Sequence, residues 1–154
     1  MLRASAIALI ALGALLTGCG STKEDTAPAA CLATPAGYLT ALESAPGAVR
    51  LPGDVPISDC LVPNQTGGQL ASVGHSMVIA ASRLNVEARR DPAGPAALQL
   101  GYLLGAVSKG ADAIHTDLVR RLNSAAHFSE GGGTQPAGFE RAFAHGYAAG
   151  HQSG

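Results

Sequence analysis

The chain has 154 residues and a formal net charge of −1, with 47 % hydrophobic residues but only 4 % aromatic residues and no tryptophan. The near-neutral charge and the lack of a basic tract argue against nucleic-acid binding and against a polybasic patch for anionic lipid. The apolar residues are largely Ala, Leu and Val, which favours closely approaching helices and argues against a sugar-binding platform built on exposed aromatic rings.

The N-terminal segment is short and apolar. Met1-Leu2-Arg3 supplies one positive charge, and the thirteen residues from Ala4 to Leu16 carry none. As a helix they would rise only about 20 Å, too short for a hydrocarbon core of roughly 30 Å. The segment therefore reads as the hydrophobic region of a signal peptide. It ends in Leu16-Thr17-Gly18-Cys19, which resembles the lipobox of bacterial lipoprotein precursors.

This resemblance implies transfer of diacylglyceryl to the Cys19 sulfur and cleavage after Gly18. Residues 1–18 would be the signal peptide, leaving 136 residues with a formal charge of −2, enough for one domain with a core. The expected location is outside the cytoplasm, on the outer leaflet of a bacterial cell membrane or on an outer membrane, with the membrane as partner through the lipid. The alternative is an ordinary signal peptide cleaved near Ala27-Pro28-Ala29, with Cys19 there by chance.

With Cys19 assigned to lipid, Cys31 and Cys60 remain as an even pair in an oxidising compartment. A disulfide between them would close a loop of about 30 residues and stabilise the fold by roughly 3–4 kcal/mol. Two free buried thiols, or two metal ligands without their partners, are the competing interpretations.

The first half of the chain predicts a tether, a short helix and an irregular connection. Residues 19–30 are small and polar, and their flexible part has a root-mean-square reach of about 18 Å. Thr34-Pro35 opens a helix that ends at Ser44-Ala45-Pro46-Gly47. Residues 48–65 are Pro-rich and predict no regular element.

The second half predicts longer helices. Thr66 with Gln69 matches a capping box, and apolar residues then recur at helical spacing to about Arg90. A second apolar pattern runs from Pro95 to Ala125 without a change of phase, which favours one long helix bent near Gly110; two helices separated there are the alternative.

A glycine-rich loop over 129–135 precedes a last helix that begins near Pro136, and the chain is expected to fray from Gly150. The fold class is therefore all-α, a small bundle of about four to five helices with one irregular segment. The domain organisation is a signal peptide (1–18), a lipidated tether (19–30), a single domain (31–150) and a tail (151–154).

Two patterns of side chains suggest chemistry only weakly. Gly74-His75-Ser76-Met77 resembles the start of a hydrolase nucleophile elbow, but Val78 replaces the second glycine and no strand precedes it, so Ser76 is expected to be a solvent-facing helix residue. No two of the five histidines are spaced to bind one metal ion from the same helix. His115 shares a helix face with Asp112, three residues before it, and a solvated His–Asp pair is the expected outcome. The sequence contains four further histidines with no such spacing: His75, His127, His145 and His151. We therefore assign no catalytic, cofactor-binding or metal-ligating residue.

Two stripes indicate packing. Ala97, Gly101 and Gly105 form a small-residue groove expected to allow close helix packing inside the domain. The aromatic stripe of Phe139, Phe143 and Tyr147 is expected in the core, with a ligand or partner groove as the alternative.

The leading functional hypothesis is a non-enzymatic lipoprotein that binds or scaffolds an envelope protein partner through helical faces. A contiguous apolar surface patch would support it. The alternatives are a small metal-dependent envelope enzyme, which needs three converging His, Asp or Glu ligands, and a small-ligand carrier with a pocket near Tyr102 or Phe143.

Overall fold

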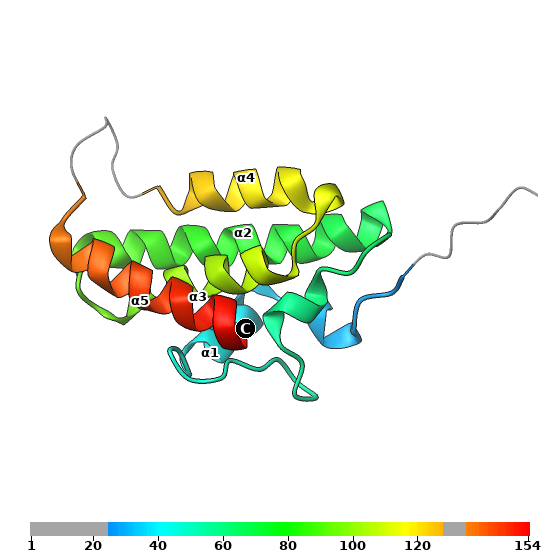
Figure 1. Ribbon diagram of the computed structural model, residues 1–154, viewed down its shortest axis with the longest axis horizontal. Helices are drawn as coiled ribbons and strands as arrows, with labels where there is room; N and C mark the ends of the chain where they lie inside the picture. The colour runs from blue at the N-terminus through cyan, green and yellow to red at the C-terminus, as the bar shows by residue number, and fades with distance from the viewer. Residues whose placement is uncertain (1–24, 128–134) are drawn as a thin grey trace, which may run out of the picture.

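The computed structural model describes residues 25–127 and 135–154, and over these ranges the protein is an all-α bundle of five α-helices without strands (Figure 1). The predicted fold class is confirmed. The signal peptide, the lipobox and most of the predicted glycine-rich loop lie outside the described residues. The elements are η1 (Ala29–Leu32), α1 (Pro35–Leu42), η2 (Ile57–Cys60), α2 (Gly67–Arg90), α3 (Pro95–Gly110), η3 (Ala113–His115), α4 (Thr116–Ala125) and α5 (Ala137–Ser153).

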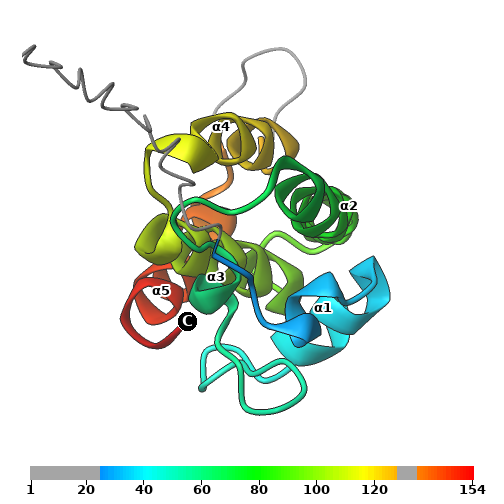
Figure 2. The ribbon, with the colours of Figure 1, turned by 90° about the vertical axis from the view of Figure 1, so that its right-hand side faces the viewer.

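Helices α2, α4 and α5 pack around α3. Figure 2, a nearly end-on view, shows α3 between α2 and α5. Helix α2 runs in the same direction as α4: Gly74 faces Leu118 at one end, and Asn85 binds main-chain oxygens of Ala125 and His127 at the other. Helices α3 and α5 run together in the opposite direction. The loop between α2 and α3 and the starting residues of α5 therefore share one end of the bundle (Figure 1).

The helix starts follow the predicted local signals, except that the capping box predicted at Thr66 is only half formed, because Gln69 Oε1 is buried without a hydrogen-bond partner. The Thr34 hydroxyl accepts a hydrogen bond from Gly37 N at the start of α1, and the Thr66 hydroxyl accepts one from Gln69 N at the start of α2. These contacts satisfy backbone donors that have no partner within the helix. Proline also occupies the first turn of α1 and of α3, where no intrahelical donor is lost. The segment between α1 and α2 is irregular, as predicted, except for the single turn of η2.

The prediction of one continuous helix over 95–125 is wrong, because α3 ends at Gly110. Gly110 packs directly on the η2 backbone: a Cβ at this position would lie 2.2 Å from Ser58 O. Ala111 is extended, and the Asp112 side chain then caps η3 by accepting from Ile114 N at 3.1 Å. The apolar phase did not reveal this break, since α4 buries Leu118 and Leu122 in the same core.

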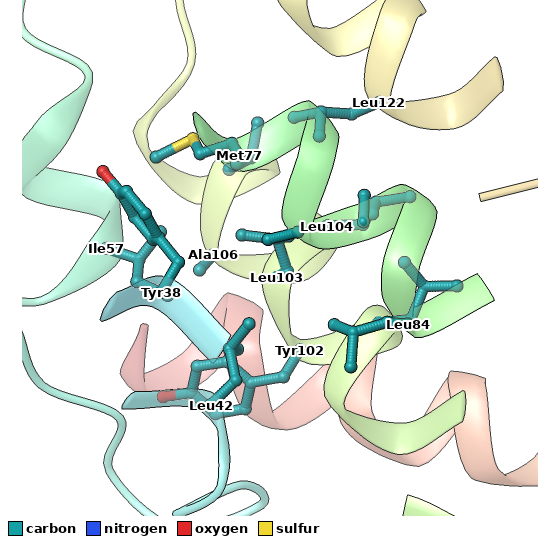
Figure 3. Close-up of a cluster of buried hydrophobic side chains, with 14 of the residues drawn as sticks. Tyr38, Leu42, Ile57, Met77, Leu84, Tyr102, Leu103, Leu104, Ala106 and Leu122 are labelled. Atoms are coloured by element: carbon teal, nitrogen blue, oxygen red, sulfur yellow. The ribbon is translucent and has the colours of Figure 1, made fainter. Parts of the chain in front are cut away.

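Aliphatic side chains around two tyrosines form the core. Figure 3 shows Tyr38 and Leu42 of α1 facing side chains of α2 and α3. Tyr102 is fully buried, and its hydroxyl accepts a hydrogen bond from Val49 N at 3.2 Å. This hydrogen bond ties the irregular segment after α1 to α3, and it gives the main-chain N–H of Val49 a partner inside the core.

Helices α3 and α5 touch backbone to backbone through glycines. A Cβ at Gly101 would lie 2.1 Å from Phe143 O, and one at Gly105 would lie 2.1 Å from Tyr147 O. The contact is reciprocal, because a Cβ at Gly146 would lie 1.9 Å from Leu98 O and one at Gly150 would lie 2.1 Å from Tyr102 O. The small-residue stripe of α3 therefore packs inside the domain, as predicted, and its partner is a second glycine stripe on α5.

The end of the chain is held in place, so the expected fraying from Gly150 is wrong. Helix α5 continues to Ser153, and Gly154 is buried. The Ser58 hydroxyl donates to Gly154 O at 2.7 Å, and the Lys109 ammonium donates to the same oxygen at 2.9 Å. Arg50 donates to Ser153 O at 2.8 Å. Residues 151–154 are therefore part of the domain and not a tail.

Candidate functional site

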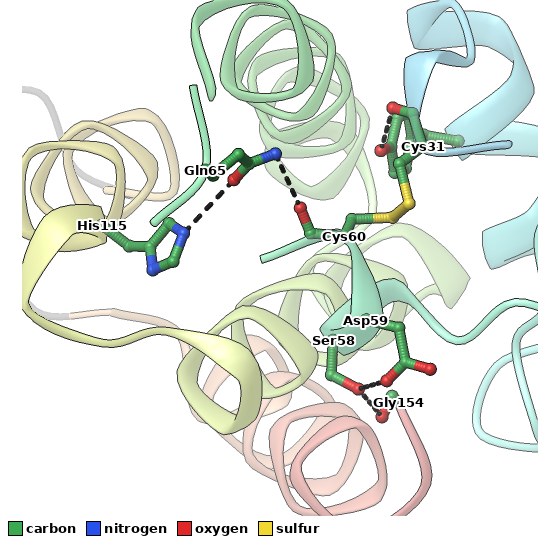
Figure 4. The surroundings of a disulfide bond; sticks show 8 residues. Cys31, Ser58, Asp59, Cys60, Gln65, His115 and Gly154 are labelled. Atoms are coloured by element: carbon green, nitrogen blue, oxygen red, sulfur yellow. Dashed lines mark hydrogen bonds between the residues drawn. A yellow bond between two sulfur atoms is a disulfide. The ribbon is translucent and has the colours of Figure 1, made fainter. Parts of the chain in front are cut away.

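The Cys31–Cys60 disulfide is present, which confirms that prediction. Its S–S distance is 2.02 Å, its Cα atoms are 5.3 Å apart, and both cysteines are fully buried. The Tyr38 hydroxyl donates to Cys31 O at 2.8 Å, and burial raises the pKa of this hydroxyl above its usual range. The bond fastens η1 to η2, so residues 29–32 are held against the bundle (Figure 4).

A buried polar chain runs from the disulfide to η3 (Figure 4). Gln65 donates through Nε2 to Cys60 O at 3.2 Å, which leaves its Oε1 facing His115 Nε2 at 3.4 Å. His115 therefore donates from Nε2, and its Nδ1 accepts the Asp112 main-chain N–H at 3.0 Å. An Asp112 carboxylate oxygen lies 2.8 Å from the same nitrogen.

The sequence paired Asp112 with His115 correctly, but a solvated pair was expected and only one partner is solvated: His115 is fully buried, whereas the Asp112 side chain is 42 % exposed. The other four histidines are exposed and lie on α2, after α4 and along α5. Within residues 25–127 and 135–154, no group of three His, Cys, Asp or Glu side chains could hold a metal ion. The Asp112–His115 pair thus has the geometry of a helix cap.

Ser76 is buried on α2, where a solvent-facing residue was expected. It lies well inside a regular 24-residue helix, and no strand-to-helix turn exposes its hydroxyl. Nucleophile-elbow geometry is therefore absent at this position.

The ordered domain begins earlier than the predicted boundary at residue 31. Asp25 forms an isolated bridge with Gln65, and Asn64 Nδ2 donates to the Asp25 carboxylate at 3.4 Å. Ala27 is buried, and η1 follows at once. Residues 25–30 therefore belong to the domain, and five residues, 20–24, separate Cys19 from it.

An open apolar groove of about 470 Å³ lies between α1 and α2, and we call it the α1–α2 groove. Its lining includes Leu39, Ile79, Leu84, Val86, Arg83 and Glu87. Val86, near the end of α2, is 50 % exposed, and together with the partly exposed Leu39 and Ile79 it forms an apolar surface rather than a single exposed side chain. The groove is an apolar surface with charged residues on it, the composition expected at a protein contact.

A second open pocket, of about 500 Å³, lies where residue 28, the segment after η2 and the end of α3 meet. We call it the anchor-end pocket, and it is lined by Pro28, Asp59, Leu61, Val62, Lys109 and Gly110, together with Ser58. Figure 4 shows Asp59 beside Ser58 and Gly154. Its lining therefore combines apolar side chains with one carboxylate and one ammonium group.

The space between α4 and α5 holds two small cavities among the described residues. Two cavities of about 150 and 60 Å³ share Leu104 and Asn123, whereas sites for small molecules usually have about 300–1,000 Å³. The aromatic stripe forms one wall: Phe139 is buried, Phe143 is half-buried and Tyr147 is 36 % exposed, with successive rings stacked 5.6 and 6.4 Å apart. The core prediction therefore holds for Phe139 and fails for Tyr147.

No protein-family model, no curated protein and no solved structure matches this chain. Among the described residues, no helix has both the length and the apolar character needed to span a bilayer.

No pattern in the sequence predicts that Asp59 and Lys109 line the same pocket. They lie far apart in the chain, one in an irregular segment and the other at the end of a helix, and only the packing of Gly110 on Ser58 brings them together. Gly110 is the one residue in the sequence that indicates the close approach of α3 to the η2 backbone.

Proposed function

We propose that this protein is a bacterial envelope lipoprotein, held on a membrane by diacylglyceryl on Cys19, whose helical domain is a non-enzymatic module for an envelope protein partner. The observation that carries the proposal is the distribution of the three cysteines. Cys31 and Cys60 are joined, and the remaining cysteine, Cys19, is the one at the lipobox position. A buried structural disulfide also fits an oxidising compartment outside the cytoplasm.

The α1–α2 groove supports the binding role. It exposes contiguous aliphatic side chains on two helices, and Arg83 and Glu87 one turn apart can fix the orientation of a docked partner. We therefore assign the partner contact to this groove.

Intact mass of the protein purified from its native membranes tests the anchor. The expected species spans residues 19–154 with a diacylglyceryl group and gains two hydrogens on reduction of the Cys31–Cys60 bond. A Cys19→Ser variant should retain the disulfide but lose both the lipid and the membrane fraction. An unlipidated wild-type species that begins elsewhere would overturn the anchor.

Photo-crosslinking in intact cells tests the groove. A photoreactive residue at Val86 lies in the groove, whereas one at Ala144, on the exposed face of α5, is the matched control. A defined protein adduct is expected at position 86 and not at position 144, and it should disappear in the Cys19→Ser background. Equal labelling at both positions would argue against a specific contact in the groove.

A further inference from the structure

The anchor-end pocket lies close to the membrane if the lipid is attached as proposed above, on which this inference rests. Six peptide steps separate Cys19 from Asp25, and each can span at most about 3.5 Å. The Asp25 Cα is therefore within about 21 Å of the lipidated residue, whatever path the chain takes. Pro28, on the pocket wall, follows only three residues later.

The pocket also lies at the correct end of the bundle. The chain enters the domain beside the start of α2, where Asp25 pairs with Gln65, and α3 ends at the same side (Figure 1). The opposite end holds the loop between α2 and α3 and the start of α5. The short link therefore favours presentation of the pocket, and not of the far end, to the bilayer.

The charges in the pocket suit a ligand that carries both signs. Asp59 and Lys109 line the same space, and these two residues do not form an ion pair with each other. The Lys109 ammonium donates to Gln152 O and Gly154 O, so one of its three donors remains for a ligand. The carboxyl end of α3 at Gly110 adds partial negative charge near a bound cation.

We propose that the anchor-end pocket binds the headgroup of a zwitterionic phospholipid. The lipid ammonium lies against Asp59 and the end of α3, and the lipid phosphate lies against Lys109. Leu61, Val62 and Pro28 contact the glycerol and the first methylenes of the lipid. The domain is thereby seated on the bilayer, and the α1–α2 groove is held at a fixed height above it for its partner.

The chain contains no tryptophan, so single-tryptophan variants can report which surface faces the bilayer. Ile114, in the turn after α3, and Val86, in the α1–α2 groove, are large exposed hydrophobic residues with exposures of 43 % and 50 %, so each can be replaced without loss of the core. The Ile114→Trp and Val86→Trp proteins, with lipidation confirmed by mass, are reconstituted into vesicles that contain a lipid with a nitroxide on its headgroup.

In phosphatidylethanolamine vesicles the Ile114→Trp protein should be quenched strongly and the Val86→Trp protein weakly. Addition of Asp59→Asn should reduce the quenching at position 114 about two- to fivefold, the effect expected for loss of one exposed ion pair. Asp54→Asn, an equal charge change outside the pocket, should leave it unchanged. Soluble glycerophosphoethanolamine should compete, and vesicles of phosphatidylglycerol, which has no ammonium, should quench less.

Equal quenching with and without Asp59→Asn, or stronger quenching in phosphatidylglycerol, would overturn the headgroup site while leaving the anchor intact. A protein without lipid by mass would overturn the proposed anchor instead, and competition by the soluble headgroup would then test the pocket on its own.

Discussion

The glycine contact between α3 and α5 predicts that one added methyl group destabilises the fold. A Cβ at Gly146 would lie 1.9 Å from Leu98 O, whereas real Cβ contacts stay above 3.0 Å, so the two backbones must separate locally by about 1 Å. A gap of that size removes a quarter to a half of the dispersion energy of the atoms that face it. Overpacking against backbone, which has no rotamer to change, should cost about 3 kcal/mol.

Alanine also has the higher helix propensity, which returns about 1 kcal/mol, so Gly146→Ala should lower the free energy of unfolding by about 2 kcal/mol. Gly68→Ala in the first turn of α2 is the matched control, because a Cβ there meets nothing within 4 Å. It should be neutral or stabilising by about 0.5 kcal/mol. Urea unfolding followed by circular dichroism measures both. A Gly146→Ala protein as stable as its parent would refute the backbone contact.

Two further predictions concern Tyr38 and the disulfide. Burial raises the pKa of Tyr38, so its neutral form stabilises the fold below the unfolded-state pKa of about 10, and this contribution is lost as the pH rises above that value. Tyr38→Phe should therefore lose stability less steeply than the parent in urea titrations between pH 8 and 11, and equal slopes would contradict the assignment. Replacing Cys31 and Cys60 by serine should cost about 3.6 kcal/mol, the loop-entropy value for a separation of 29 residues, and an unchanged urea midpoint would contradict it.

The elements that could be predicted from the sequence carry their signals locally. Thr66 with Gln69, the proline at residue 95 and the apolar period of α2 each act within a few residues, and the structure has helices there. The two cysteines were paired correctly because, once Cys19 was set aside for lipid, only Cys31 and Cys60 remained. Local chemistry of this kind survives packing with little change.

The errors have one physical cause, which is contact between distant segments. The helix break at Gly110 depends on Ser58, the order of the last residues depends on Arg50, Ser58 and Lys109, and the burial of His115 depends on Gln65. None of these partners is visible as periodicity. The anchor-end pocket arises from the same contacts, so it could not be predicted either.

The parallel pairing of α3 with α5 also affects the order in which the domain can form. The face of α3 that carries Gly101 and Gly105 is covered by the backbone of α5. Helix α5 follows α4 and is the last of the five helices along the sequence. Contacts between segments so far apart form only after a long loop has closed. This face of α3 therefore stays uncovered until α5 forms and packs against it, which delays completion of the core. Such delay suits a polypeptide that must cross a membrane before it folds, as the proposed location requires.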